Sequence, residues 1–316
     1  MKLAPIALLP VSALVLAGCA GTGPAEDDLL HIVASTSVYG DIAAQIGDDL
    51  VEVTSIIDSP AQDPHSYEAS ARDRLALERA DVVLENGGGY DPFVDRLLEA
   101  SAAEPVVLTA VEIAGLAEGE HAEDEHAEEA EPDDHGGHDH IEGVNEHVWY
   151  DLHVVDEVAH QLAHELGELD PGHAETYEAN YARWAGGYEV LHDRVHELEE
   201  QYGGAAFALT EPVPAYLLLS IGLDDQTIPE FAEAVEEGTD VPPLVLQQML
   251  EIAGSGELAL LAYNSQTAGP ETERVRDAAD AAGVPIVEVT ETLPEGEDYL
   301  SWMTANLDRI EAALAR

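Results

Sequence analysis

The chain has 316 residues, enough for one large or two ordinary domains, and its formal net charge at pH 7 is −55. It holds 11 Lys and Arg residues against 66 Asp and Glu residues, and Lys2 is the single lysine. This balance excludes a basic surface for nucleic acid, a Walker lysine and a Schiff-base lysine. The acidity indicates a solvated surface suited to a salty or acidic habitat, and it would attract cations weakly over long range.

The N-terminal stretch predicts a secretory signal followed by a lipid anchor. Residues 1–18 carry one charge, Lys2, and an apolar run that prolines interrupt, which is too short and broken for a membrane span. The run ends in Leu-Ala-Gly before Cys19, the one cysteine of the chain. It resembles a bacterial lipobox, in which this cysteine is lipidated and becomes the mature N-terminus. We expect a signal peptide over 1–18, a tether over 19–29, and a protein held outside the cytoplasmic membrane without a disulfide.

Residues 30–169 predict an N-terminal α/β lobe. Short apolar runs alternate with segments of helical periodicity, which argues for a parallel sheet with helices on both faces. Ligands of such sheets lie in loops beyond the carboxyl ends of the strands. The expected strands are 30–34, 51–57, 81–85 and 105–111, and the expected helices are 38–46, 70–80, 92–102 and 153–169.

Histidines stand out at two loops of this lobe. His65 lies in the loop after the second expected strand, where it could be an ordinary turn residue or a ligand. His147 lies just before an apolar and aromatic pair, again at a loop. His160 and His164 are four residues apart on a helix, but they lack the glutamate of a His-Glu-x-x-His motif, so we interpret them as surface residues.

The insert 118–142 differs from the rest of the lobe. It is dense in carboxylates, has no basic residue and is almost without apolar residues, so it cannot form a core and is expected to be disordered. It could be a merely solvated acidic loop, but its imidazoles suit loose, low-affinity capture of zinc, copper or nickel. The histidines of this insert are His121, His126, His135, His138 and His140.

Residues 170–203 predict one long spine helix. Asp170 can cap it, Pro171 suits its first turn, and Gly203 can end it. Some thirty residues at 1.5 Å each reach roughly 45 Å. A coiled-coil strand would have the same spacing, but glycines and aromatic residues along the seam favour a helix on which two lobes pack. The apolar face consists of Ala174, Tyr177, Tyr181, Trp184, Tyr188, Leu191, Val195, Leu198 and Tyr202.

Residues 204–316 repeat the alternation and predict a C-terminal α/β lobe. Glu211 and Glu291 fall just past the ends of two expected strands, so the two lobes together offer carboxylates and histidines to a cleft between them. The expected strands are 205–210, 258–263 and 285–290, and the expected helices are 213–222, 244–253, 271–282 and 299–315.

The combined motifs resemble the zinc/manganese solute-binding lipoproteins of ABC importers over nearly the whole chain. They are Asp63-Pro-His-Ser-Tyr-Glu68, Asn86-Gly before Asp91-Pro-Phe, the histidine-rich insert, Glu146-His-Val-Trp149 and the long helix. The resemblance implies two α/β lobes, each a mainly parallel sheet flanked by helices, joined by one rigid helix with a metal ion between them. By position, it implies that His65 and His147 are the ligands from the N-terminal lobe.

The C-terminal lobe departs from the zinc pattern of that family. Glu211 stands where the zinc branch usually has histidine, and Glu291 lies one residue beyond the place of the family's final acid. Two histidines and two carboxylates resemble the manganese branch, because carboxylate oxygens suit manganese. The histidine-rich insert is typical of zinc importers, and zinc has the greater intrinsic affinity. We therefore expect Zn²⁺ as the transported ligand, with Mn²⁺ as the alternative.

The implied function is capture rather than catalysis. The loaded protein, expected to be a monomer, would dock on the transmembrane permease of an ABC importer whose separate ATPase supplies the energy. Two functions of other classes are open at this stage. A zinc hydrolase would need an open metal position and a general base, and a surface adhesin, a role found in the same fold family, would bind a host protein.

The lipobox yields a first prediction. Cys19→Ser should release the protein from the membrane, because the thiol that carries the lipid is gone. Fractionation of cells into membrane and soluble pools, with the unaltered chain as control, tests it. A variant that stays in the membrane pool would contradict the lipid anchor.

Overall fold

The structure is a computed structural model, and it describes residues 29–59, 61–62, 64–116 and 145–316. The expected signal peptide, the lipidation site Cys19 and the histidines of the insert 118–142 lie outside the described residues. Within the described part of the chain, no helix is both long enough and apolar enough to cross a membrane.

The first lobe is an α/β layer structure on a four-stranded sheet. Its elements are β1 (Leu30–Thr36), α1 (Ser37–Gly47), η2 (Asp48–Leu50), β2 (Val51–Ile57), α2 (Ala71–Leu77), β3 (Val82–Glu85), α3 (Phe93–Ala100), β4 (Val106–Thr109), α4 (Ala110–Ile113), η3 (Val148–Tyr150) and α5 (Leu152–Leu169). All pairings are parallel, and the strand order is β2-β1-β3-β4. Alternate residues of β1 point to opposite faces, so Ile32 packs with α1 and α5 while Val33 packs with α2 and α3.

The second lobe repeats this plan. Its elements are β5 (Ala206–Leu209), α7 (Ala215–Ser220), β6 (Asp224–Asp225), α8 (Pro229–Glu236), α9 (Pro243–Ala253), β7 (Leu260–Asn264), α10 (Pro270–Ala282), β8 (Ile286–Val289) and α11 (Tyr299–Leu314). The sheet is parallel with the order β6-β5-β7-β8, so each strand has a counterpart at the same place in the first sheet. The predicted fold class is confirmed, and α4, β6 and α8 are elements that the sequence analysis did not predict.

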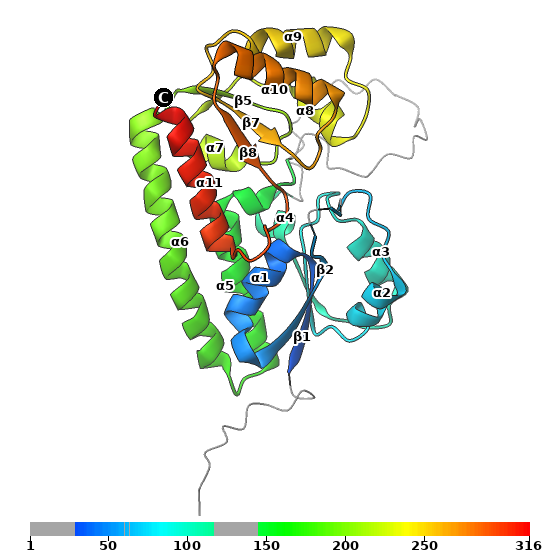
Figure 1. Cartoon of the computed structure of the whole chain (residues 1–316). Coiled ribbons are helices and arrows are strands. Elements are labelled where there is room, and N and C mark those ends of the chain that lie inside the picture. The colour runs from blue at the N-terminus through cyan, green and yellow to red at the C-terminus, as the bar shows by residue number, and fades with distance from the viewer. Residues whose placement is uncertain (1–28, 60, 63, 117–144) are drawn as a thin grey trace, which may run out of the picture.

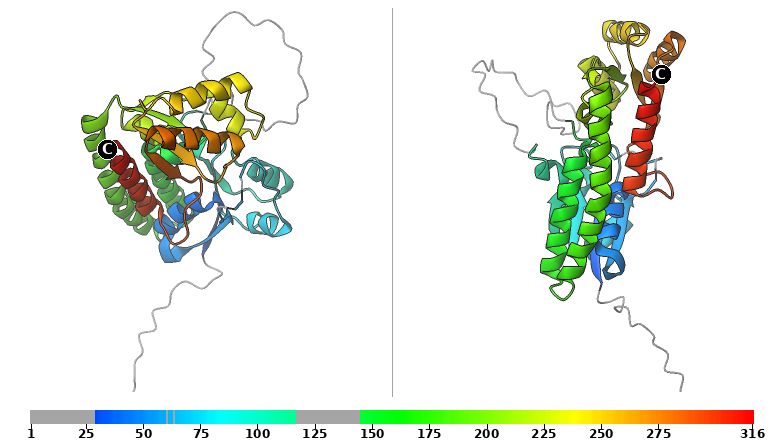
Figure 2. Two further views of the ribbon diagram at one scale, coloured as in Figure 1. Left: turned by 45° about the horizontal axis from the view of Figure 1, so that its top comes forward. Right: turned by 90° about the vertical axis from the view of Figure 1, so that its left-hand side faces the viewer.

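A single long helix, α6 (Ala174–Tyr202, 29 residues), runs along both lobes (Figure 1). It packs against α1 and α5 of the first lobe and α11 of the second, as the side view in Figure 2 shows. Its predicted apolar face is buried or half-buried throughout the aromatic stretch. A Cβ at Gly187 would lie 2.5 Å from Leu300 Cδ1, so glycine lets α11 approach closely.

The helix begins three residues later than expected. His173 is the N-cap of α6, whereas Asp170 is the C-cap of α5. The Asp170 carboxylate lies 2.6 Å from His173 Nδ1, so it bridges the turn between the two helices. The end of the helix agrees with the prediction, since Gly203 is its C-cap.

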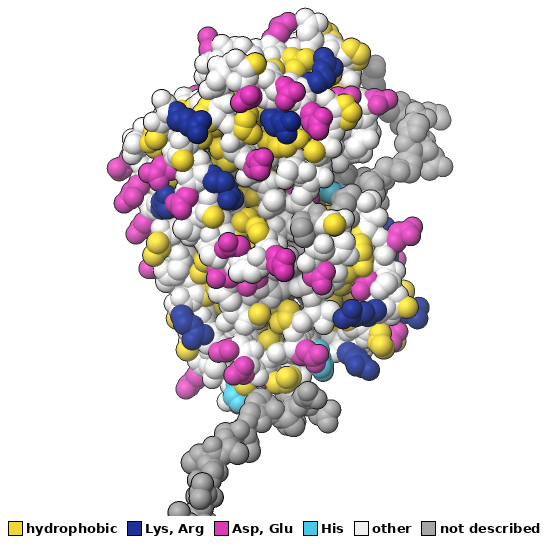
Figure 3. Space-filling view, viewed as in Figure 1, with side chains coloured by type: hydrophobic (Ala, Val, Ile, Leu, Met, Phe, Trp, Pro, Cys, Tyr) yellow, Lys and Arg dark blue, Asp and Glu magenta, His cyan; other side chains and the backbone are white. Residues whose placement is uncertain are grey.

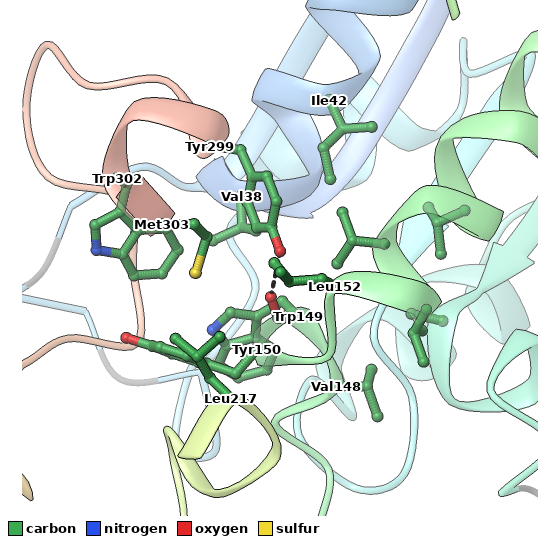
Figure 4. Packing of buried hydrophobic residues seen from close by; sticks show 14 of the residues in the cluster. Val38, Ile42, Val148, Trp149, Tyr150, Leu152, Leu217, Tyr299, Trp302 and Met303 are labelled. Atoms are coloured by element: carbon green, nitrogen blue, oxygen red, sulfur yellow. Dashed lines mark hydrogen bonds between the residues drawn. The ribbon is translucent and has the colours of Figure 1, made fainter. Parts of the chain in front are cut away.

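One hydrophobic core is continuous between the lobes. It contains residues of β1, α1, α5 and α6 together with residues of β5, β7, β8, α7 and α11, while each sheet has a smaller separate core on its other face. Figure 4 shows the junction, where Trp149 and Tyr150 of the first lobe meet Tyr299, Trp302 and Met303 of α11. Burial of one such large apolar side chain is worth about 1.5–3 kcal/mol. The shared core therefore strongly opposes separation of the lobes.

Hydrogen bonds from α11 reinforce this junction. The Tyr299 hydroxyl donates to the carbonyl of Trp149 at 2.8 Å, and the Tyr299 N–H donates to the Asp41 carboxylate at 2.9 Å. Both contacts connect the start of α11 to the first lobe.

The outer surface is acidic, as the composition predicts. Asp and Glu side chains are scattered over the face shown in Figure 3 rather than gathered in one patch.

Glu85 at the end of β3 is a buried carboxyl group that should make stability depend on pH. Burial, followed by the nearby Asp91 charge, raises the pKa of Glu85 from 4.5 to about 8. Between these values the folded chain holds a proton that the unfolded chain has released. Stability contributed by this group is therefore present at low pH and falls as pH rises toward about 8.

We predict that Glu85→Gln flattens this dependence. Glutamine keeps an oxygen acceptor for the Thr109 hydroxyl, which donates to Glu85 at 2.8 Å, and it cannot ionise. The Tm of the metal-free variant should fall a few degrees less than that of the parent between about pH 5 and about pH 8. Glu52→Gln, at a side chain 60% exposed, serves as the control. Equal slopes for the parent and Glu85→Gln would contradict the prediction.

Candidate metal centre

Two histidines from separate loops of the first lobe meet at the junction of the lobes. His65 follows β2, and its side chain is 10% exposed, while His147 precedes η3 and is fully buried. Their ring centroids are 6.4 Å apart. The Tyr90 ring packs edge-on against both, with centroids 4.9 Å from His65 and 5.9 Å from His147. Tyr90 thus restricts the orientation of both imidazoles.

Asn145 orients both the backbone and the ring of His147. Its Oδ1 accepts a hydrogen bond from the His147 N–H at 3.1 Å and lies 2.7 Å from Nδ1 of the ring. Oε1 of Glu236 lies 3.6 Å from the same Nδ1. The Asn145 oxygen within hydrogen-bond distance of Nδ1 favours the proton on that nitrogen, so Nε2 carries the lone pair that can bind a metal ion.

The segment 145–150 is anchored to the first lobe through Asn86. The Asn86 side-chain amide donates to the carbonyl of Glu146 at 2.9 Å. Asp91 accepts hydrogen bonds from the N–H groups of Asn86 and Gly87 at 2.7 and 2.8 Å, and burial raises the pKa of Asp91 to about 6. Gly87 has φ 75°, and a Cβ there would lie 2.4 Å from a side chain of β4, so this turn requires glycine.

The second lobe holds the same segment by hydrogen bonds to backbone carbonyls. The Asn145 amide donates to the carbonyl of Pro212 at 3.0 Å, and the Tyr216 hydroxyl donates to the carbonyl of Asn145 at 2.7 Å. The Tyr150 hydroxyl donates to the carbonyl of Thr290 at 2.7 Å. Both carbonyls contributed by the second lobe belong to residues directly adjacent in sequence to its two predicted ligands.

Asn264, the last residue of β7, connects those two predicted ligands. Its amide nitrogen donates to Glu291 Oε1 at 2.7 Å and also to Glu211 Oε2. The Thr267 hydroxyl donates to the same Glu211 oxygen, and the Glu291 N–H donates to Gln266 Oε1 at 2.7 Å. Both carboxylates are almost fully buried, at 1% and 4% exposure for Glu211 and Glu291. Each is therefore held by neutral donors inside the fold.

The structure brings three of the predicted ligands into one group. His65, His147 and Glu291 each offer a ligand atom, and these atoms all lie within 4.8 Å of one another. Glu211 lies beside the group, because the Asn264 amide touches its carboxylate and that of Glu291. Histidines of one lobe and a glutamate of the other thus face a common point between the sheets.

Two further glutamates border the site, and the sequence analysis did not propose them as ligands. Glu146, Glu236 and His147 form a second group whose ligand atoms lie within 4.8 Å of one another. Glu146 is 2% exposed, and its Oε1 lies 3.9 Å from His65 Nδ1. Glu236 ends α8, a helix that Pro229 at its start and Gly238 beyond its end could have revealed.

These carboxylates create a strongly negative site. Burial, and then the charges of Glu146, Glu211 and Glu291, raises the pKa of Glu236 to about 9. The apo site is thus expected to hold a proton at neutral pH. A divalent cation would replace such a proton and offset the repulsion between the carboxylates, and the donor set of imidazole nitrogens and carboxylate oxygens fits a transition metal.

His160 and His164, which the sequence analysis interprets as surface residues, belong to neither of these groups. His160 and His164 are exposed on α5, and the His160 ring packs on Tyr181 with centroids 5.0 Å apart. His160 Nδ1 lies 3.9 Å from Glu157 of the same helix. Their environment agrees with the interpretation of both histidines as surface residues.

The comparisons with known proteins agree with the fold. The family ZnuA, described as zinc-uptake complex component A, periplasmic, matches residues 32–313. The chain is 27% identical to a manganese-binding lipoprotein, MntA, of Halalkalibacterium halodurans, over 98% of this chain and 97% of that protein. It is 26% identical to an iron ABC transporter substrate-binding lipoprotein, MtsA, of Streptococcus pyogenes, over 98% of this chain and 97% of that protein.

Solved structures share the same architecture. The periplasmic zinc-binding protein TroA from Treponema pallidum aligns with a TM-score of 0.67 at 20% identity, over 90% of this chain and 99% of that chain. The FpvC protein of Pseudomonas aeruginosa in complex with Mn²⁺ aligns with a TM-score of 0.70 at 21% identity, over 91% and 98% of the two chains. Members of this family are substrate-binding proteins and not enzymes. Because the family match spans nearly the whole described fold, the chain belongs to the ZnuA family of metal-binding proteins of ABC importers.

Proposed function

We propose that this chain is the extracytoplasmic component of a high-affinity ABC importer and binds one divalent transition-metal ion between its lobes. The observation that carries the proposal is the convergence of His65 and His147 of the first lobe with Glu291 of the second. Glu211 completes the ligand set from the position that Asn264 gives it. Four protein ligands would enclose the ion, which suits transport better than catalysis.

The lipid on Cys19 would hold the protein at the outer face of the cell membrane, where a permease and its separate ATPase can receive the ion. The relatives named as lipoproteins of ABC transporters support this placement. The segment 118–142 would add weak metal capture near the membrane, because its imidazoles suit the same ions.

We propose zinc as the cargo. Two buried imidazoles suit zinc, and the Irving–Williams order gives zinc a higher affinity than manganese at a given set of nitrogen and oxygen ligands. Manganese is the second candidate, and the buried glutamates Glu146 and Glu236 favour it, since a carboxylate-rich environment suits that ion. A relative named for manganese supports the same alternative.

The lobe arrangement supports a binding cycle with small motions. A wide opening of the lobes would break the core that they share. It would also break the hydrogen bonds next to Glu211 and Glu291 in the second lobe. Shifts of loops around the site would require fewer contacts to change. We therefore expect slight closure around an ion rather than the wide hinge motion of sugar-binding proteins.

The first prediction from this proposal concerns the identity of the ion. Isothermal titration of metal-stripped protein should give one tight site, with zinc bound at least about tenfold more tightly than manganese, a difference of about 1.4 kcal/mol. Tighter binding of manganese would replace zinc by the second candidate. Absence of a tight site for either ion would contradict the proposed function itself.

The second prediction concerns the ligands. His65→Ala, His147→Ala and Glu291→Gln should each weaken zinc binding at the tight site by more than about tenfold. The alanine changes remove a donor nitrogen, and Glu291→Gln replaces a charged carboxylate oxygen by a neutral amide oxygen. His160→Ala is the matched control, since that imidazole is exposed on α5. Thermal unfolding of the metal-free variants verifies that they fold. If His147→Ala and Glu291→Gln bind zinc as the control does, the ion does not bind at this group.

A further inference from the structure

A second set of histidines lies in a surface pocket away from the metal centre. The pocket has a volume of about 230 Å³ and lies where the start of α5, the second half of α6 and the end of α7 meet. Its lining includes His153, His192, His196, Asp151 and Glu199. None of these residues belongs to the metal centre described above.

The spacing of two of these histidines is suited to chelation. His192 and His196 are four residues apart on α6, so their side chains project from the same face of the helix. Their ring centroids are 5.0 Å apart, and the rings are perpendicular. A pair of histidines at this spacing on a helix binds zinc in metalloproteases, which shows that the geometry can hold one ion between two imidazoles.

The surroundings of His196 prepare it to be a ligand. Its Nδ1 lies 3.2 Å from a carboxylate oxygen of Glu199 on the next turn of α6. A carboxylate at this nitrogen favours the proton on Nδ1 and leaves Nε2 as the donor atom. Metal-binding histidines usually have such a carboxylate at the ring nitrogen that does not bind the ion, and Glu199 provides it for His196.

A third imidazole comes from another helix. His153 lies in the first turn of α5, and its backbone N–H donates to the Asp151 carboxylate at 2.9 Å. Because α5 and α6 pack side by side, His153 and the histidines of α6 line the same pocket. Among the described residues, these histidines are not in a group of three ligand atoms within 4.8 Å of one another, so the pair on α6 supplies the ligands and His153 only lines the pocket. Imidazole ligands suit zinc, nickel or copper and not calcium or magnesium.

We propose that His192 and His196 form a second transition-metal site on the outer face of α6, in the pocket that His153 also lines. The site takes ions that prefer imidazole, such as Zn²⁺, and water fills the remaining positions. It is open to solvent, since the His196 side chain is 65% exposed. It therefore exchanges its ion more readily than the buried centre, and it shares no ligand with that centre.

Another histidine pair of the chain provides a matched control. His160 and His164 have the same spacing and are also exposed, on α5. These two residues do not line the pocket, and His160 Nδ1 lies 3.9 Å from Glu157, compared with 3.2 Å between His196 Nδ1 and Glu199. Spacing alone would make the two pairs equivalent, whereas the proposal assigns metal binding to the pair in the pocket.

The test is zinc bound per chain at equilibrium dialysis, at about pH 7.5, where free imidazole is mostly neutral. The full chain is compared with His192→Ala/His196→Ala and with His160→Ala/His164→Ala. Histidines in segment 118–142 contribute equally to all three proteins. The first double variant should lose one equivalent of zinc, and the second should lose none. Alanine favours helix, so neither change should disturb its helix.

Zinc-edge anomalous scattering from crystals soaked in Zn²⁺ gives the position directly. A peak about 2.1 Å from a ring nitrogen of both His192 and His196 supports the proposal. Equal zinc content in the parent and the His192→Ala/His196→Ala variant, or an equal loss in the control, would overturn it. His147→Ala should empty the buried centre and leave this site occupied, so the two sites can fail separately.

Discussion

The rest of the structure depends on the hydrophobic core that the two lobes share. Because α1 and α5 of one lobe pack into the same core as α7 and α11 of the other, the carboxyl ends of both sheets face each other across a short distance. Around this core, hydroxyl groups of Tyr150, Tyr216 and Tyr299 bond to backbone carbonyls on the opposite lobe. These bonds fix the position of the backbone next to the ligands. The packing of the shared core therefore determines how closely the ligands of the two lobes approach one another.

Charge is the second constraint, and it opposes the first. The shared core removes water from Glu146, Glu211 and Glu291, and this burial is costly for groups of like charge. Asn264 and Thr267 offset part of the cost with neutral donors, and the raised pKa of the neighbouring Glu236 keeps a further negative charge out of the metal-free site. A site that repels itself when empty gains from a dication both coordination and relief of this repulsion. The free energy that folding spends on burying these like charges is partly recovered when the metal ion binds.

Local patterns in the sequence predicted the layers of the fold and the apolar face of α6, because strand runs and helical spacing reflect nearby residues. The turn before α6 was missed, since Asp170 and Pro171 also match a helix start and only packing selects His173 as the cap. The helix α8, which brings Glu236 to the site, has only eight residues, so it offers few turns of helical spacing to detect. The loops of His65 and His147 were identifiable, but their approach to Glu291 depends on contacts between residues more than a hundred positions apart.

The equal strand order of the two sheets has a consequence for capture. Asn86 directly follows the third strand of the first sheet and Asn264 ends the third strand of the second, and each donates its amide to its own half of the site. Each lobe thus has an internal amide that supports its own ligands, in addition to the hydrogen bonds that cross between the lobes. If the lobes part slightly, both halves keep their shape. The ligands of each lobe are then already ordered when an ion arrives, so binding costs little conformational entropy of these side chains.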